Sequence, residues 1–213
     1  MAKESEIFSD KIQDDAIIIR EAKPDIEDGL VFAQFFDEAS EGFFKSILGI
    51  KTYEIIADAF VKSNNEYSFE NAIMIEYKGK IVGMVSGYTY SEKQGFKKNI
   101  LSEFPKGAKL RIMMFLVIGK VLSRFLGPRG KEDYYLQSIA VSIQMRGKGL
   151  GQRLMKHIGE IAIDKGSKTL SLDVSSKNEN AINSYKKFGM EIFSYWPNFL
   201  KLPPVFTRMV KEL

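Results

Sequence analysis

A short glycine-rich segment carries the clearest chemical signal in this sequence. It runs Arg146-Gly147-Lys148-Gly149-Leu150-Gly151, between a predicted strand and a predicted helix. Alternating glycines let the backbone approach a ligand closely, because no Cβ atom stands in the way. The first turn of a helix offers unpaired N–H groups and the positive end of its dipole, and Arg146 and Lys148 add charge. The segment predicts a pyrophosphate cradle; a glycine turn that packs a helix tightly on a strand is the alternative.

Two common phosphate-binding motifs fit this segment poorly. A P-loop requires Gly-Lys-Ser or Gly-Lys-Thr, and neither occurs in the chain. A Rossmann fingerprint requires G-x-G-x-x-G, whereas the spacing of Gly147, Gly149 and Gly151 is one residue short. The segment also comes late in the chain, while dinucleotide folds usually carry their fingerprint after the first strand.

Composition excludes several kinds of chemistry. The 213 residues include no cysteine and one histidine, His157. Disulfides, thiolate metal sites and a cysteine acyl-enzyme are therefore excluded, as is a multi-histidine metal site, and we expect no metal. The formal charge of +4 allows an anionic ligand without indicating a nucleic-acid partner. An apolar fraction of 45% with 27% charged residues is typical of a soluble globular protein, and we expect residues 1–213 to form one domain.

Hydrophobic periodicity and turn residues predict an α/β protein with a sheet of mixed direction. The expected strands are 16–22, 68–77, 81–90, 134–141, 169–174, 190–195 and 205–212. The expected helices are 28–40, opened by Pro24 and Asp25, a broken region over 41–48 and 53–62, and then 148–165 and 179–188. Residues 91–130 contain several glycines and prolines around an apolar stretch, and we interpret them as an insertion of loop plus helix.

The sequence favours a cytoplasmic location. Residues 1–15 lack the apolar core of a secretory signal. The most apolar stretch, Ile112 to Gly119, is far shorter than the roughly 20 residues of a membrane-spanning helix. We favour a buried or partly buried helix at this point, with a helix lying on a membrane surface over residues 110–126 as the alternative.

The glycine-rich segment and its flanks resemble the GNAT superfamily of acyl-CoA-dependent N-acyltransferases. The family's core motif is Q/R-x-x-G-x-G/A, and Arg146, Gly149 and Gly151 match it. The preceding strand, which ends Ile139-Ala140-Val141, is similar to the family's central strand. The resemblance implies a GNAT-like mixed, splayed β-sheet flanked by helices.

A second signature strengthens the resemblance. Asn178-x-x-Ala181-x-x-x-Tyr185, followed by Lys187-Phe188-Gly189-Met190, is similar to the family pattern N-x-x-A-x-x-x-Y-x-x-x-G-F. Met190 replaces the usual phenylalanine, which is a conservative change in bulk. The two signatures together cover the chain from about Tyr134 to Phe193.

The resemblance implies acetyl-CoA, or another acyl-CoA, as the cosubstrate. The central strand would pair with the pantetheine arm through Ile139, Ala140 and Val141, and Asn178 would hold the arm or cap its helix. The pyrophosphate would be held by backbone N–H groups of the turn and the helix start, which are Met145, Arg146, Gly147, Lys148, Gly149, Leu150 and Gly151.

Chemistry then assigns further roles, since an amine that attacks a thioester must lose a proton and the departing thiolate benefits from an acid. Tyr185, which the resemblance places beside the sulfur, is the expected catalytic acid, or else a packing tyrosine. A backbone N–H near Ala140 or Val141 is the expected donor to the oxyanion. The base stays open among Glu132, Asp133, Asp173 and Glu76, and Gln137 is excluded by its chemistry. We expect His157 to be structural, because the helix carries it away from the cradle.

The expected function is transfer of an acyl group from acyl-CoA to a primary amine by direct transfer in a ternary complex. A non-catalytic acyl-CoA sensor on the same fold is the alternative, and a basic membrane-surface protein is a third possibility. The acceptor is open among small amines, peptide N-termini, protein lysines, aminoglycosides and polyamines. Residues 32–60, 88–129 and 195–204 are the expected acceptor regions, and a homodimer is possible.

Overall fold

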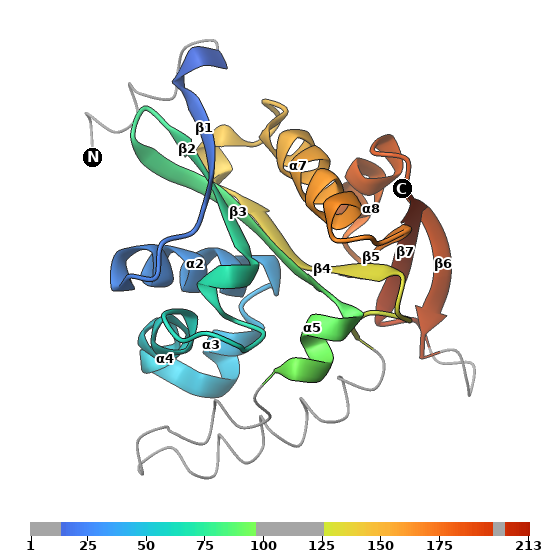
Figure 1. Cartoon of the computed structure of the whole chain (residues 1–213), viewed down its shortest axis with the longest axis horizontal. Coiled ribbons are helices and arrows are strands. Elements are labelled where there is room, and N and C mark those ends of the chain that lie inside the picture. Colours follow the sequence, from blue (N-terminus) through green and yellow to red (C-terminus); the bar gives the residue numbers. More distant parts are fainter. Residues whose placement is uncertain (1–13, 97–125, 198–202) are drawn as a thin grey trace.

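The computed structural model describes residues 14–96, 126–197 and 203–213, which form a mixed sheet with helices on both faces (Figure 1). Seven strands of the described residues lie in the order β1-β2-β3-β4-β5-β7-β6. Neighbouring strands are antiparallel except β4 and β5, which run parallel. The strands are β1 (Ile17–Glu21), β2 (Ala72–Tyr77), β3 (Lys80–Thr89), β4 (Asp133–Val141), β5 (Thr169–Ser175), β6 (Glu191–Trp196) and β7 (Phe206–Glu212). The predicted α/β fold class is confirmed.

Helices cover the two faces of this sheet (Figure 1). One side carries α2 (Ile26–Ala39), α3 (Phe43–Leu48) and α4 (Thr52–Phe60), and the other carries α7 (Leu150–Asp164) and α8 (Glu179–Lys187). Strand β2 shows why both layers are needed, because its side chains alternate between the faces. Ile73 and Ile75 join the apolar core under α7, whereas Met74 joins the core under α2 and α4.

Local signals placed most of the helices correctly. Asp25 caps α2, accepting a hydrogen bond of 2.9 Å from the Asp28 N–H, as expected from acidic residues at a helix start. The helical spacing of Leu150, Leu154, Ile158 and Ile161 predicts an apolar stripe on α7; the first three are buried and Ile161 is partly buried. Gly166, with φ of 77°, follows this helix as a left-handed stop.

The insertion begins with a helix that the sequence did not predict. Strand β3 ends at Thr89, and α5 (Tyr90–Gly95) follows directly. Thr89 and Glu92 form a capping box, in which the Glu92 N–H donates to Thr89 Oγ1 and the Thr89 N–H donates to Glu92 Oε2. The apolar stretch Ile112 to Gly119, and the membrane-surface reading that rests on it, lie outside the described residues. Within the described residues, no helix has the length and apolar character that crossing a bilayer demands.

The centre of the sheet opens between β4 and β5. These parallel strands pair only where Asp133, Tyr134 and Tyr135 face Thr169, Leu170 and Ser171. Beyond Tyr135, β4 keeps its ladder to β3, with a bulge at Gln137 that leaves this residue opposite no partner. The segment from Leu136 to Val141 therefore presents an edge toward β5 that no described strand occupies. This opening is the splay that the family resemblance implied.

Candidate active site

The glycine-rich turn forms an open cradle at the start of α7. Gly147 and Gly149 have φ values of 75° and 83°, a region that side-chain-bearing residues rarely adopt. A Cβ atom added at Gly147, Gly149 or Gly151 would meet no atom within 4 Å. The glycines therefore face open space, which favours the cradle over the alternative of tight packing between helix and strand.

The electrostatics of this turn suit an anion. Gly149 is the N-cap of α7 and offers no side-chain acceptor, and the first turn contains no acidic residue. The first N–H groups of the helix therefore lack a capping partner and point toward the cradle. Arg146 folds back toward β4, where its Nε donates to the Val141 carbonyl at 3.1 Å. Met145 and Leu150 are buried, so they could serve a ligand only through their backbone.

The free edge of β4 leads directly to the cradle. Ile139 and Val141 pack toward the α7 core, while Ala140 packs toward the α2 core. The hydroxyls of Ser138 and Ser142 on this stretch are buried and have no hydrogen-bond partner in the described part of the chain. Buried hydroxyls without partners are costly, so this stretch is prepared for a polar ligand.

Tyr185 lies on α8 and Asn178 directly precedes this helix, which is hydrogen-bonded to the cradle helix at Ser184. Gln152, in the first turn of α7, donates from Nε2 to the Ser184 carbonyl at 3.0 Å. This bond places the turn of Tyr185 beside the start of α7. Burial raises the pKa of the Tyr185 phenol to about 12, so the phenol is protonated at neutral pH. Asn178 is the N-cap of α8 and accepts from the Ala181 N–H at 3.1 Å, which is the capping role that the sequence left open.

The carboxylates that the sequence offered as bases are all engaged. Glu132 pairs with Lys168, and Glu76 with Arg20. Asp133 accepts hydrogen bonds from Thr169, Ser171 and the Arg129 N–H. Asp173 is held by the Arg208 guanidinium and by the Tyr135 hydroxyl at 3.1 Å.

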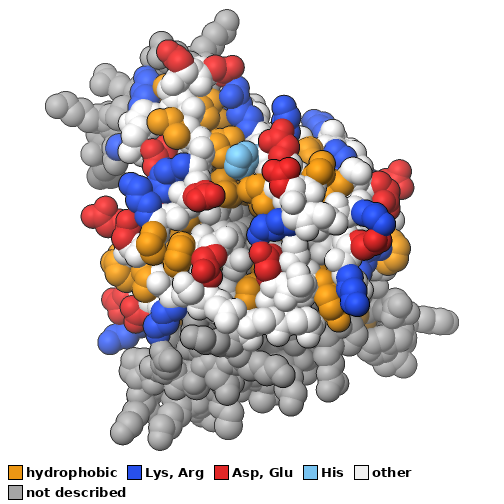
Figure 2. All heavy atoms as spheres, viewed as in Figure 1, with side chains coloured by type: hydrophobic (Ala, Val, Ile, Leu, Met, Phe, Trp, Pro, Cys, Tyr) orange, Lys and Arg blue, Asp and Glu red, His pale blue; other side chains and the backbone are white. Residues whose placement is uncertain are grey.

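His157 lies on α7, where basic and acidic side chains are interspersed over the surface (Figure 2). Its side chain is 37% exposed, and Nδ1 is 3.8 Å from Glu160 Oε2. No hydrogen bond or ion pair joins it to the residues of the cradle in the described part of the chain, in keeping with a structural role.

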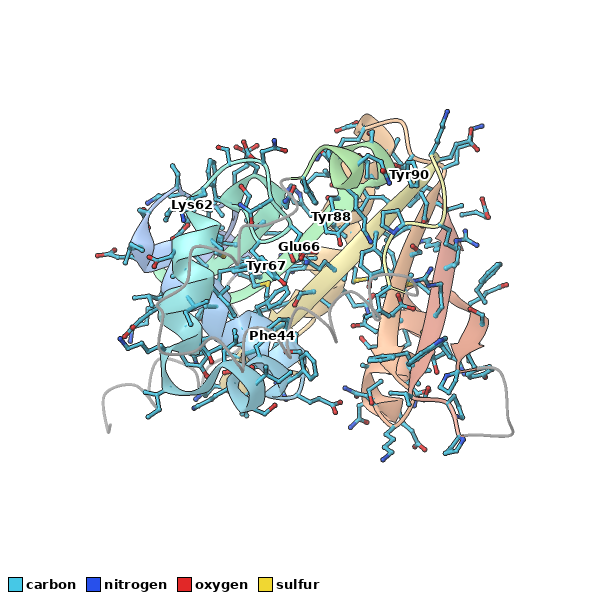
Figure 3. The ribbon with its side chains drawn as sticks, turned by 90° about the horizontal axis from the view of Figure 1, so that it is seen from below. Phe44, Lys62, Glu66, Tyr67, Tyr88 and Tyr90 are labelled. Atoms are coloured by element: carbon cyan, nitrogen blue, oxygen red, sulfur yellow. The ribbon has the colours of Figure 1, made fainter. Side chains whose placement is uncertain are left out.

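Glu66 is a carboxylate that the sequence did not single out. It follows α4 and lies in the middle of the molecule, with Tyr67 and Tyr88 close by (Figure 3). Burial raises the pKa of Glu66, while Lys93 and a hydrogen bond from the Tyr67 hydroxyl partly oppose the shift. Burial also raises the pKa values of both phenols well above their usual range, so both keep their protons.

These groups connect to the opening in the sheet. The Tyr88 ring lies 5.8 Å from the Tyr135 ring, and the Tyr135 hydroxyl donates to Asp173. Tyr135 is also the last β4 residue paired with β5. A continuous run of phenols and carboxylates therefore extends from Glu66 to the point where the two strands separate.

A hollow of about 450 Å³ adjoins the far end of this run. Its charged lining consists of Arg129, Asp173 and Arg208. The remaining lining is mainly aromatic, from Phe193, Tyr195, Trp196 and Phe206, with Leu126 and Ser194. The expected acceptor regions 88–129 and 195–204 both contribute to it.

The model of the acetyltransferase (GNAT) family matches residues 32–190. The chain belongs to the acetyltransferase (GNAT) family. The match covers most of the chain and includes both signatures, the diverging strands and the cradle. The predicted recognition is confirmed.

Curated relatives of this GNAT protein are acetyltransferases of different substrate classes. A thialysine N-epsilon-acetyltransferase from Bos taurus is 39% identical over 59 residues, which is 28% of this chain and 35% of that protein. N-alpha-acetyltransferase 50 from Danio rerio is 29% identical over 114 residues, or 53% of this chain and 66% of that protein. The chain thus spans about a third of the first relative and about two thirds of the second.

Solved structures share the fold of this GNAT protein. An N-acetyltransferase from Staphylococcus aureus Mu50 has a TM-score of 0.69 at 18% identity, covering 91% of this chain and 100% of that chain. A putative acetyltransferase from Salmonella typhimurium, solved with its cofactor acetyl-CoA, has a TM-score of 0.55 at 15% identity, covering 92% and 94%.

The residues of this GNAT protein fit an acyl-CoA cosubstrate. The open glycines and uncapped N–H groups suit a pyrophosphate, and the strand edge with its unpartnered Ser138 and Ser142 hydroxyls suits an amide-bearing arm. The structure brings the predicted cradle residues and the turn of Tyr185 together. The sequence did not single out Glu66, Tyr88 or Arg129, because the contacts that bring them to this region join distant segments.

Proposed function

We propose that this GNAT protein is an N-acetyltransferase that moves an acetyl group from acetyl-CoA to a primary amine by direct transfer in a ternary complex. One observation carries the proposal: α7 begins with an open glycine cradle just where β4 runs free of β5. A pyrophosphate in the cradle and an extended arm along β4 would place a thioester near the opening. The absence of cysteine excludes a cysteine acyl-enzyme.

Several groups of the chain would support this transfer. Acetyl-CoA, when bound, supplies a thioester carbonyl that an unprotonated amine can attack. A backbone N–H near Ala140 or Val141 would stabilise negative charge on the carbonyl oxygen. The Tyr185 phenol, which keeps its proton at neutral pH, would donate it to the departing thiolate.

We further propose that Glu66 takes the proton from the amine. An alkylamine is an ammonium ion at neutral pH and cannot attack until that proton is removed. The Glu66 carboxylate is a stronger base than an exposed one, because burial raises its pKa. Tyr67 and Tyr88 keep their protons at neutral pH. As neutral phenols they can orient the amine by hydrogen bonding, while Glu66 alone accepts the proton of the amine.

Calorimetric titration with acetyl-CoA, with NAD and ATP as controls, tests the proposed function. We expect saturable binding of acetyl-CoA and none of the controls, followed by thiol release when an amine acceptor is added. Absence of binding by acetyl-CoA and by longer acyl-CoA esters would contradict the proposal. Binding without thiol release for any amine class would favour the sensor instead.

A further inference from the structure

The hollow beside β6 and β7 contains an arginine whose hydrogen-bonding capacity is unused. The Arg129 guanidinium lies 4.4 Å above the Phe193 ring, which fixes it by a cation–π contact. Its Nε is 3.8 Å from Asp133 Oδ2, beyond hydrogen-bonding distance. The side-chain N–H groups of Arg129 therefore have no acceptor among the described residues.

The neighbouring carboxylates are occupied elsewhere. Asp133 accepts from Thr169 Oγ1 at 2.7 Å, from Ser171 Oγ at 2.6 Å and from the Arg129 backbone N–H at 2.8 Å. Asp173 is bound by both Arg208 and the Tyr135 hydroxyl. Of the two arginines that line the hollow, Arg208 is hydrogen-bonded to Asp173, whereas Arg129 forms a longer ion pair of 3.8 Å with Asp133 and makes no side-chain hydrogen bond to a described residue.

We propose that the hollow binds a carboxylate of the amine acceptor, held by the planar fork of Arg129. An arginine fork matches the two oxygens of a carboxylate, because its N–H groups can donate two parallel hydrogen bonds. The aromatic side chains Tyr195, Trp196 and Phe206 would contact the apolar part of the same molecule. The acceptor class is therefore an amine that also carries a carboxylate, as in an amino acid or a short peptide.

The place of the hollow links this carboxylate to the reaction. Asp173 lines the hollow and holds Tyr135, which is the last residue of β4 to pair with β5. An acceptor whose carboxylate reaches Arg129 would extend its amine toward the opening where the proposed thioester lies. The inference rests on the proposed function and names the substrate class of that same site.

Trp196 provides a direct readout of binding. It is the single tryptophan of the chain and lines the hollow, so its fluorescence reports occupancy without any turnover. Two pairs of probes isolate the carboxylate: L-lysine against cadaverine, and 6-aminohexanoate against hexylamine. We expect a saturable fluorescence change with each acid, and binding weaker by about tenfold or more for the matched amine that lacks the carboxylate.

Variants of Arg129 then test the fork. Arg129→Gln should weaken binding of L-lysine by about tenfold or more, and Arg129→Lys should restore only part of it, because a lysine offers charge without the fork. Lys131→Gln is the matched control, since Lys131 is exposed, two positions away and outside the lining. It removes the same charge and should leave the affinity for L-lysine within twofold of wild type.

Three outcomes would overturn the inference. They are no saturable change with either acid, equal affinity for the acid and its matched amine, or an Arg129→Gln protein that binds L-lysine as wild type does. The calorimetric titration with acetyl-CoA is independent of these results. If acetyl-CoA binds but the Trp196 fluorescence shows none of the expected differences, the carboxylate site alone is rejected. If acetyl-CoA does not bind, the proposed function is rejected.

Discussion

At the scale of single residues, Glu66 differs from Asp28 and Asp173 in its surroundings. Asp28 and Asp173 face arginine side chains at hydrogen-bonding distance. Glu66 instead faces the Tyr67 and Tyr88 phenols, with Lys93 as its nearby cation. Desolvation raises the pKa of Glu66, and Lys93 and the Tyr67 hydroxyl offset only part of that rise. A carboxyl with a raised pKa is suited to accept a proton near neutral pH.

Glu66→Gln should remove one ionisation from the pH profile of kcat/KM. Glu66 acts only when ionised, so wild-type kcat/KM should rise with pH through a pKa above the ordinary 4.5. The variant should lose this limb and about a hundredfold or more in kcat/KM at neutral pH, while binding acetyl-CoA normally. Glu54→Gln, an exposed carboxylate on α4, is the control. If kcat/KM of Glu66→Gln still rose with pH through the same pKa, that ionisation would belong to the ammonium group of the acceptor and not to Glu66.

Tyr185→Phe should lower kcat while leaving the affinity for acetyl-CoA unchanged. The phenyl ring preserves the packing of α8 on the core, so only the proton donor is lost. Wild-type activity should also show no loss due to this phenol up to about pH 10, because its pKa is about 12. Steady-state kinetics and calorimetry measure both effects, with Tyr53→Phe as the control. Unchanged kcat would transfer the acid role to water or to another residue.

At the scale of elements, α7 combines two tasks along its length. Its apolar stripe anchors it on the sheet through Leu150, Leu154 and Ile158. Its first turn stays uncapped and open, because Gly149 contributes no side-chain acceptor. The buried stripe fixes the direction of the helix, and this direction aims the free N–H groups at the end of β4.

Gly151→Val separates the cradle from the fold. Gly151 is helical, and a Cβ there meets no atom within 4 Å, so valine should be tolerated by the fold. Its methyl groups would occupy the cradle and should weaken acetyl-CoA binding by about tenfold to a hundredfold, measured by calorimetry. Gly149 is a poorer test, because its φ of 83° makes any replacement strained. Lys156→Val is the control, because it places a valine elsewhere on α7. Normal binding of acetyl-CoA by Gly151→Val would refute the assignment of the cradle as the pyrophosphate site.

At the scale of the whole molecule, one sheet joins two apolar cores, and an ion-pair network ties its edge to α2. Arg20 on β1 donates to Glu76 on β2 at 2.5 Å and to the two oxygens of Asp28 on α2 at 2.7 and 2.9 Å. Asp28 also accepts from the Lys23 N–H at 2.7 Å. These bonds couple the helical layer to the edge of the sheet.

Asp28→Asn should destabilise the protein by roughly 3 kcal/mol, because it leaves Arg20 partly uncompensated at a site where Asp28 is buried. Burial raises the pKa of Asp28, but the bonds from Arg20 and Lys23 outweigh it, so the folded pKa lies below 3.8. The stability that ionised Asp28 contributes is therefore fully present above the pKa of this carboxyl in the unfolded chain. It is lost as pH falls through the pKa of the carboxyl in the folded protein.

Acid unfolding followed by circular dichroism measures this effect. The stability of Asp28→Asn should depend less on pH in the acid range than that of wild type. Glu27→Gln, an exposed carboxylate in the same helical turn, should behave as wild type does. Parallel acid profiles for Asp28→Asn and wild type would contradict the assignment.

The sequence by itself determined the cradle and most of the elements around it. Positive φ angles at Gly147 and Gly149, the stripe of α7 and the Asp25 cap depend on residues a few positions apart, so local spacing reveals them. The sequence does not indicate helix α5, although its capping box is equally local, because the apolar pattern of the preceding strand continues through Tyr90.

Only the tertiary structure decided which groups meet at the opening. The separation of β4 from β5 depends on how far two distant strands stay paired, and no local pattern encodes that length. Glu66 lies in a polar stretch that resembles an exposed loop, and its interactions with Tyr88 and Lys93 come from segments farther along the chain. Arg129 gains its orientation from Phe193, far along the chain. Contacts of this kind follow from the arrangement of the layers, which is why burial and charge pairing could not be inferred from residue types alone.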